Sequence, residues 1–269
     1  RRLISRSFAS RAVERLEPQV RTLCQQVIDR IAERDTGDFV ADIASQVPMQ
    51  VIFLLLGVPE SDWPHLVQLT DTMMNKGNSD EGFSAVMNLY MYADQLASAR
   101  RQQPGDDMVS QLLTAELGGE LLTQAEFNAF FFLLVVAGNE TTRNLIAGGM
   151  LALLNHPAEL ARLRADPALL GSAVEEMLRY VSPVTEFRRT ANCDIELHGK
   201  TLREGDRVIL VHASANRDER VFADPDRFDI TRSPNQHLAF GVGPHLCIGA
   251  TLARLAARCM FDEIFRRLS

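Results

Sequence analysis

A ten-residue stretch near the carboxyl end of the chain, Phe240–Gly249, places one cysteine, Cys247, among three glycines. Glycine adopts backbone conformations that other residues avoid, so this segment can bend sharply and lie close to a flat ligand. The residues that follow, 250–258, are rich in alanine, leucine and arginine, which favour a helix. Cys247 is therefore expected at or just before a helix amino-terminus, where free N–H groups favour a thiolate, a soft ligand suited to iron.

A lone cysteine is more often a small buried apolar residue than a ligand. The order F-G-x-G-x-H-x-C-x-G favours the ligand, because it fixes six positions out of ten. It resembles the haem-binding loop of the cytochrome P-450 superfamily of haem-thiolate monooxygenases. The resemblance implies that Cys247 binds the iron of haem b, that Phe240 shields the sulfur, that His245 meets a propionate, and that Gly249 completes the loop.

Composition limits the other classes of function. The chain has 269 residues, of which 46% are hydrophobic, which suffices for one large core or two small ones. A net charge of −7 does not favour nucleic-acid binding. Four widely spaced cysteines favour a reducing compartment, hence the cytoplasm. The longest apolar run, 129–138, is too short for a membrane span, while the start at Arg1 leaves a targeting segment open.

The apolar spacing predicts a mainly α fold with a small antiparallel β region. A capping box at Thr123–Glu126 begins the longest predicted helix, about 123–154, which at 1.5 Å per residue extends roughly 48 Å. Other helices are expected over 10–34, 48–56, 63–74, 83–101, 106–117, 166–182 and 250–268, and strands over 194–197 and 207–211. The resemblance implies one haem-binding domain over 1–269, a cytochrome P-450 fold without its N-terminal part and C-terminal strands.

Glu176 and Arg179 lie three residues apart on one helix face, where charged pairs are common and weak when exposed. Their order, followed by Pro225-Asp226-Arg227-Phe228, resembles the family's E-x-x-R helix and its later P-x-R-F segment. The resemblance implies that Glu176, Arg179 and Arg227 form a buried charged triad that locks the loop behind the haem. Removal of one member would then leave the other buried charges unpaired.

Arg189 resembles the family's propionate-binding arginine, and a guanidinium pairs well with a carboxylate. Arg188 can take this role instead, or Arg189 can be a solvated side chain. The resemblance assigns the other propionate to Arg1. Arg1, Arg2 and Arg6, with Arg254 and Arg258, are either a basic patch that attracts an acidic ferredoxin or a solvated set of arginines.

The middle of the long helix departs from an apolar pattern at residues 137–142. Ala137 and Thr141 share one face, and Gly138 lets the backbone approach the haem. Glu140 and Thr141 match the family's acid–alcohol pair, so Glu140 is expected to relay protons and Thr141 to hold a hydrogen bond on the oxygen side. The alternatives are helix packing for Gly138, a bond to its own backbone for Thr141, and an ion pair with Arg143 or Arg188 for Glu140.

The resemblance implies a monooxygenase that uses O₂ and inserts oxygen into a C–H bond of a terpenoid, steroid or fatty-acid-like molecule. Electrons would come from a ferredoxin-type donor and its NAD(P)H reductase. A peroxygenase that uses H₂O₂ and a haem sensor without turnover remain alternatives. The residues expected to line the substrate pocket are Phe130, Leu133, Leu134, Ala137, Val184, Thr185 and Phe187.

Overall fold

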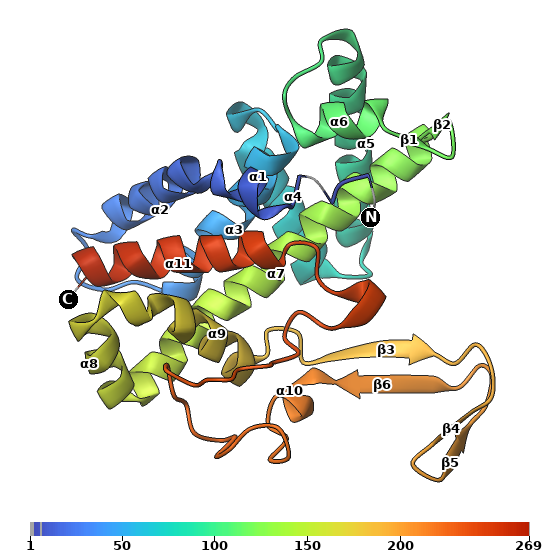
Figure 1. Cartoon of the computed structure of the whole chain (residues 1–269). Coiled ribbons are helices and arrows are strands. Elements are labelled where there is room, and N and C mark those ends of the chain that lie inside the picture. Colours follow the sequence, from blue (N-terminus) through green and yellow to red (C-terminus); the bar gives the residue numbers. More distant parts are fainter. Residues whose placement is uncertain (1–2, 6, 269) are drawn as a thin grey trace. The chain divides into compact units, whose positions relative to one another are not determined.

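The computed structural model describes residues 3–5 and 7–268, without the side chain of Leu117. Within this part, the chain is mainly helical with three two-stranded antiparallel sheets, as the pattern predicts (Figure 1). It divides into two compact units, one of residues 1–143 with 248–269 and the other of residues 144–247. None of the described helices is long and apolar enough to cross a membrane. The expected roles of Arg1, Arg2 and Arg6 fall outside the described residues.

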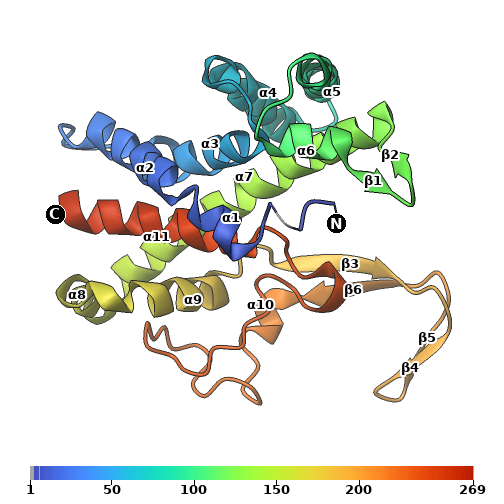
Figure 2. The same cartoon turned by 45° about the horizontal axis from the view of Figure 1, so that its top comes forward.

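The first unit is a helical assembly in which α2 lies along α11 and α4 lies along α5 (Figures 1 and 2). Arg21 of α2 links the first pair through an ion pair of 2.7 Å with Asp262 of α11. The elements of this unit are α1 Ser10–Glu14, α2 Glu17–Ile31, a π-helical turn Val40–Ala44, α3 Gln46–Leu56, a 3₁₀ turn Glu60–Asp62, α4 Trp63–Lys76, α5 Asp80–Gln102, α6 Met108–Thr114, β1 Glu116–Leu117, β2 Glu120–Leu121, most of α7 Gln124–Asn155, and α11 Ala250–Arg267.

Two helix ends in this unit follow their sequence signals. Gly57, at φ 78°, ends α3 in the left-handed conformation that favours glycine, and Val58 N donates to Phe53 O at 2.9 Å. At the start of α7, Glu126 Oε2 accepts from Thr123 N at 2.9 Å, and Thr123 Oγ1 accepts from Glu126 N at 3.3 Å. The capping box is thus confirmed, and α7 has 32 residues.

Two predictions in this unit were wrong in detail. The single helix expected over 10–34 is interrupted, because Pro18 has no N–H to continue the hydrogen-bond ladder of α1 into α2. The helix expected over 106–117 is shorter: Asp107, and not its neighbour Asp106, caps α6 by accepting from Ser110 N at 2.8 Å, and residues 116–117 form β1. The apolar spacing marks the helices well but says little about which of two adjacent aspartates caps one.

The second unit contains α8 and α9, two β-hairpin-like pairs and a long irregular segment. Its elements are the end of α7, α8 Pro157–Ala165, a 3₁₀ turn Pro167–Leu169, α9 Leu170–Val181, β3 Glu186–Thr190, β4 Ile195–Leu197, β5 Lys200–Leu202, β6 Arg207–Val211, α10 His212–Ala215 and a 3₁₀ turn Gly243–His245. The strands expected over 194–197 and 207–211 are both present, but they do not pair with each other as one small sheet. β4 turns back through His198–Gly199, both at positive φ, to pair with β5, while β6 pairs with β3.

Candidate functional site

The cysteine loop closes on itself through its backbone. Cys247 N donates to Phe240 O at 2.8 Å, and Leu246 N donates to Gly243 O at 3.0 Å within the 3₁₀ turn. Gly241 and Gly243 take φ of 69° and 70°, a region where side-chain-bearing residues are strained, so both glycines are needed for this path. The loop presents Cys247, which is exposed, three residues before the start of α11.

The surface of the second unit carries several exposed apolar side chains. On the loop, Val242 is 71% and Leu246 is 45% exposed. On β3, Phe187 is 46% exposed, and its partner on β6, Leu210, is 42% exposed. His245 on the loop is also exposed. Water-exposed apolar groups on both the loop and the β3–β6 pair are what a flat apolar ligand would cover.

Behind the loop, Glu176 and Arg179 form a fully buried ion pair on α9. Arg179 Nε donates to Glu176 Oε2 and Arg179 Nη2 to Glu176 Oε1, both at 2.8 Å. Arg179 Nη1 also donates to the carbonyl oxygens of Asn216 at 2.8 Å and Pro225 at 2.7 Å. Glu176 accepts from Asp229 N at 2.9 Å. The pair is therefore satisfied on all sides, as a buried pair must be, and it holds the irregular segment 216–238 to α9.

The third charged side chain of this cluster differs from the expectation. Arg232 Nε lies 3.2 Å from both oxygens of Glu176, and its side chain is only 10% exposed. Arg227, the expected member, is exposed, and only its carbonyl oxygen takes part, accepting from Arg179 Nη2 at 3.0 Å and Arg232 Nη2 at 2.8 Å. Arg227 is thus corrected to Arg232 as the partner of Glu176. The segment's turns, which place residue 232 against α9, carry no sequence signal.

Arg189 lies on β3 with its guanidinium over the ring of Phe187, 5.6 Å from the centroid, and it donates to the carbonyl oxygen of Arg188 at 3.0 Å. His212, the first residue of α10, lies edge-on against Phe187, and its Nδ1 is buried without a hydrogen-bond partner. Burial and the charge of Arg189 lower the pKa of His212. The sequence reasoning missed His212, whose only sequence signal is its place after a strand.

The middle of α7, in the first unit, contains the expected reaction-centre residues. Thr141 Oγ1 donates to Ala137 O at 3.0 Å, and Arg143 Nη2 lies 3.2 Å from Glu140 Oε1. A Cβ on Gly138 would meet Cδ1 and Cγ1 of Ile52 at 2.4 Å, so α3 packs closely here. These contacts match the structural alternatives named for each residue: a bond to its own helix backbone for Thr141, an ion pair for Glu140 and helix packing for Gly138. The roles in catalysis stay predictions.

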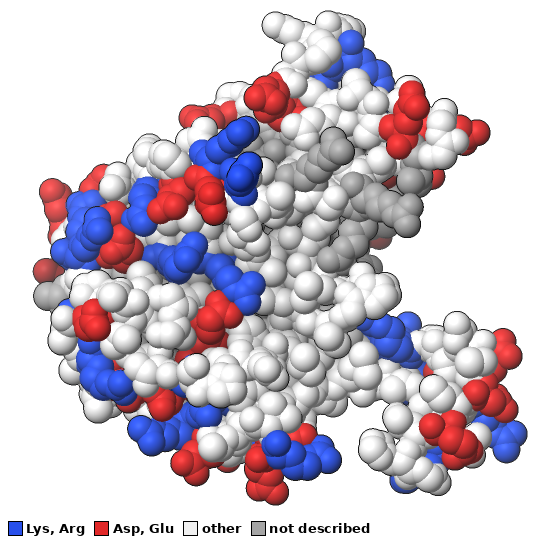
Figure 3. Space-filling model, in the orientation of Figure 1, with Lys and Arg blue, Asp and Glu red and all other residues white. Residues whose placement is uncertain are grey.

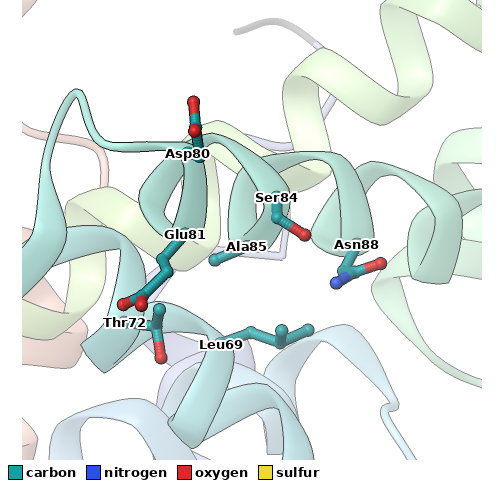
Figure 4. A pocket seen from close by; sticks show the side chains of 7 residues that line it. All are labelled: Leu69, Thr72, Asp80, Glu81, Ser84, Ala85 and Asn88. Carbon is teal, nitrogen blue, oxygen red and sulfur yellow. The ribbon is translucent and has the colours of Figure 1, made fainter.

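The residues expected in the substrate pocket fall in both units. On α7, Leu134 is buried, Phe130 is half-buried, and Leu133 and Ala137 are exposed. In the second unit, Val184 is half-buried and Thr185 and Phe187 are exposed. Two hollows on the first unit contain none of them. One, of about 390 Å³, lies between α4 and α5 with Asp80, Glu81 and Asn88 at its wall (Figure 4). The other, of about 550 Å³, is lined by residues of α2, α3 and α4.

Comparison with known proteins identifies the family. The cytochrome P450 family model matches residues 49–269. The chain belongs to the cytochrome P450 family. It is 40% identical to the methyl-branched lipid omega-hydroxylase of Mycobacterium tuberculosis and 39% identical to that organism's steroid C26-monooxygenase, over 100% and 98% of this chain. It spans only 65% and 62% of their lengths. The solved Mycobacterium marinum cytochrome P450 CYP268A2 in complex with pseudoionone matches with a TM-score of 0.94 and 39% identity, over 100% of this chain and 68% of that one.

Cytochromes P450 bind haem b through a cysteine thiolate, and they use O₂ with electrons from a redox partner. The second unit fits that cofactor. It supplies an exposed cysteine on a glycine-shaped loop, exposed apolar side chains for a flat ring, and the cation of Arg189 for a carboxylate. Among the described residues, no cluster of three or more His, Cys, Asp or Glu side chains could hold a metal ion in another way.

Of the residues expected to form a basic patch, Arg254 and Arg258 lie one turn apart on α11, half-buried and exposed respectively. Around α2 and α11, positive and negative side chains are interspersed on the visible face (Figure 3). Arg21 pairs with Glu17 and Asp262, and Arg267 pairs with Asp29. The described part of this surface is therefore mixed in charge.

Proposed function

We propose that the protein to which these residues belong is a haem-dependent monooxygenase that inserts one atom of O₂ into a C–H bond of an apolar molecule. The observation that carries this proposal is the closed loop in which Cys247 N donates to Phe240 O and the cysteine is left exposed. A bound haem thiolate supplies O₂ activation, with the thiolate pushing electron density to favour O–O cleavage. The rest of the chemistry falls to the protein's own side chains.

Each set of residues has a definite task in this proposal. Cys247 is the iron ligand, held by the loop, with Phe240 and Gly249 at its two ends. His245 and Arg189 bind the propionates, with Arg1 as a further candidate. The buried pair of Glu176 and Arg179 keeps the segment 216–238 in place. The residues that bind the substrate and exclude water are Phe130, Leu133, Leu134, Ala137, Val184, Thr185 and Phe187.

Protons are the task of α7. Glu140 lies on the helix surface, beside Arg143, where its carboxylate can take up a proton from solvent. Thr141 can pass a proton through its hydroxyl once Oγ1 turns away from Ala137 O. Gly138 leaves the backbone of the same turn without a side chain. General acids of this kind contribute on the order of 10²–10⁴ in rate.

The substrate class rests on apolar side chains and on the relatives. Phe130, Leu133, Leu134 and Phe187 offer no charge to a ligand. One relative is named a methyl-branched lipid omega-hydroxylase, another a steroid C26-monooxygenase, and the matched structure holds pseudoionone. The proposal is therefore a terpenoid, steroid or fatty-acid-like substrate. A panel of such compounds, each tested for a substrate-induced spin-state shift of the haem, ranks these classes directly.

Electrons are proposed to come from a ferredoxin-type donor and its NAD(P)H reductase in the cytoplasm, the location favoured by the widely spaced cysteines. Arg254 and Arg258 on α11 offer two cations one turn apart to an acidic carrier. If they form its docking site, the rate of electron transfer falls as salt rises and falls further in Arg258→Ala. Indifference to both changes removes α11 from the docking surface.

A peroxygenase that uses H₂O₂ is the second candidate, and one observation favours it. Both proton-handling side chains are engaged within α7, Thr141 with Ala137 O and Glu140 with Arg143. A peroxygenase needs no pair of protons delivered for O₂ cleavage. Product formed with H₂O₂ alone, at a rate equal to that with NAD(P)H and its reductase, would decide for this candidate.

The test of the main proposal is spectroscopic. The reduced holoprotein with CO should show the strongly red-shifted Soret band of thiolate-bound haem. Cys247→Ser should abolish this band, whereas Cys193→Ser, at another exposed cysteine of the same unit, should leave it unchanged. A wild-type band at the position of imidazole-bound haem would refute the assignment of Cys247.

A further inference from the structure

Two consecutive backbone N–H groups just before the cysteine loop each donate to a buried side chain. Leu238 N lies 2.6 Å from Asn216 Oδ1, and Ala239 N lies 3.2 Å from His237 Nδ1. Asn216 is fully buried, and the side chain of His237 is 3% exposed. Polar side chains are costly to bury unless they are hydrogen-bonded. The hydrogen bonds of Asn216 and His237 therefore offset the cost of burying them.

Both side chains are also fastened to α9. Asn216 Nδ2 donates to Ser182 Oγ, at the end of α9, at 2.8 Å, and Asn216 O accepts from Arg179 Nη1 at 2.8 Å. His237 Nε2 lies 3.1 Å from Glu175 Oε2. The main chain at 238–239 is thus fixed to both the middle and the end of one helix.

The hydrogen-bond partners assign the state of the imidazole. Because Ala239 N–H donates to His237 Nδ1, this nitrogen carries no proton. The ring proton is then on Nε2, directed at the carboxylate of Glu175. One ring therefore accepts from the loop segment and donates to α9, and only a group with an acceptor and a donor in these places can do both.

The same path continues to the cysteine. Gly241 N donates to Leu238 O at 2.9 Å, and Cys247 N donates to Phe240 O at 2.8 Å. The ring of His237 lies 6.1 Å from that of Phe240. An unbroken series of contacts therefore runs from α9 through Asn216 and His237 to 238–241 and on to the backbone of Cys247.

We propose that Asn216 and His237 are positioning residues that hold Cys247 in place as the iron ligand, an inference that rests on the proposed function. They touch neither substrate nor iron in this proposal and act through residues 238–240. Without them, the carbonyl of Phe240 would lose its fixed position. The Cys247 thiolate would then be protonated, or would bind the iron more weakly, more easily than in the wild type.

The experiment compares two replacements of His237 in the holoprotein. His237→Phe keeps a ring against Phe240 and loses both hydrogen bonds. His237→Asn places an amide oxygen where Nδ1 accepts from Ala239 and loses the bond to Glu175. The matched control is His156→Phe, in the same unit. His156 Nδ1 is hydrogen-bonded to Ala152 O at 2.7 Å, and its ring packs against Tyr180 and Phe228, so these contacts lie with α7, α9 and residue 228.

Two quantities are measured, the rate at which the reduced CO complex loses its thiolate Soret band and the exchange rate of the Cys247 amide proton. In His237→Phe both should rise by roughly tenfold or more, because two hydrogen bonds are lost. His237→Asn should fall between His237→Phe and wild type, because it restores one of the two bonds. His156→Phe should match wild type in both.

Wild-type rates in His237→Phe, or an equal rise in His156→Phe, would overturn the inference, since the first shows no role and the second only a loss of general stability. A wild-type protein without the thiolate band would instead overturn the proposed function. Amide exchange at Cys247 would then still decide whether His237 fixes this backbone.

Discussion

The hydroxyl of Thr141 donates to the carbonyl oxygen of Ala137 at 3.0 Å, one turn back along α7. A hydroxyl in a helix often satisfies itself in this way, and the bond is worth only about 1 kcal/mol. The cost of turning it toward another acceptor is therefore small. A variant without the hydroxyl therefore tests whether Thr141 acts in catalysis.

Thr141→Ala should leave substrate binding intact but uncouple the enzyme. NAD(P)H is still consumed, whereas more peroxide and less product are released, because the hydroxyl that holds a proton near the oxygen is gone. We expect product per NAD(P)H to fall on the order of tenfold, at the low side of general-acid effects. The control is Thr142→Ala, at the buried neighbouring threonine. Coupling that is unchanged in Thr141→Ala would leave this threonine with its bond to Ala137 alone.

Glu140→Gln should slow turnover itself, by about 10²-fold, because an amide cannot relay protons. The solvent isotope effect on the rate should change as well. Arg143→Gln is the matched control, since it removes the ion pair with Glu140 and keeps the carboxylate. Equal losses in both variants would show that the ion pair matters and the proton relay does not.

Because Arg232, and not Arg227, contacts Glu176 through its side chain, the two arginines should differ in their effect on stability. Arg232→Ala should lower the free energy of unfolding by about 2 kcal/mol, because two charge-assisted contacts to the buried Glu176 are lost. Arg227→Ala should change it by less than about 0.5 kcal/mol, since its side chain is exposed and its carbonyl bonds remain. Urea unfolding of both variants measures this. A larger loss in Arg227→Ala would restore the original triad.

The cluster around Glu176 also shows which parts of the site can be predicted from the sequence. The helix that carries Glu176 and Arg179 follows from apolar spacing, although it begins later than expected: the Asp166 side chain accepts from Ala168 N and caps the 3₁₀ turn Pro167–Leu169, and α9 starts at Leu170. The choice between Arg227 and Arg232 does not, because both lie in a segment without periodicity. Their positions depend on contacts such as Arg179 with Pro225 O, which form between residues 46 apart in the chain.

Strand pairing shows a second limit. β3 reads Glu-Phe-Arg-Arg-Thr, and all five residues are exposed, so it lacks the alternation that identifies a half-buried strand. His212 and Asn216, which follow β6, carry no motif of their own. They become notable only through an orphaned Nδ1 and a complete set of hydrogen bonds, both of which require coordinates.

Gly138→Ala should destabilise the protein, although alanine favours a helix more than glycine does. The new Cβ would lie 2.4 Å from two carbon atoms of Ile52, and overpacking of this kind costs about 1–3 kcal/mol. Ile52→Ala removes both atoms, so in that background Gly138→Ala should be neutral or stabilising. A double-mutant cycle of unfolding free energies tests the pair. Additive effects would show that the cost of a side chain at residue 138 does not come from its contact with Ile52.

The two buried cysteines of the first unit predict a loss of stability in alkali. Burial raises the pKa of Cys259 to about 11. Burial also raises the pKa of Cys24, and negative charge on the neighbouring Cys259 and Glu263 raises it further. An unfolded thiol titrates near pH 8.5. The folded state therefore keeps its protons over a range in which the unfolded chain releases them. The contribution is complete below about pH 8.5 and is lost as the pH rises toward 11, by about 1.4 kcal/mol for each unit of pKa difference.

Urea unfolding at a series of pH values from 7 to about 10 measures this loss. Cys259→Ala should flatten the alkaline decline relative to wild type, even though the smaller side chain lowers stability at neutral pH. Cys193→Ala, at an exposed thiol, should leave the slope unchanged. Because tyrosines and lysines also titrate in alkali, the informative quantity is the difference between variant and wild type at each pH. Parallel curves for Cys259→Ala and wild type would mean that Cys259 ionises alike in the folded and unfolded states, contrary to its burial between α2 and α11.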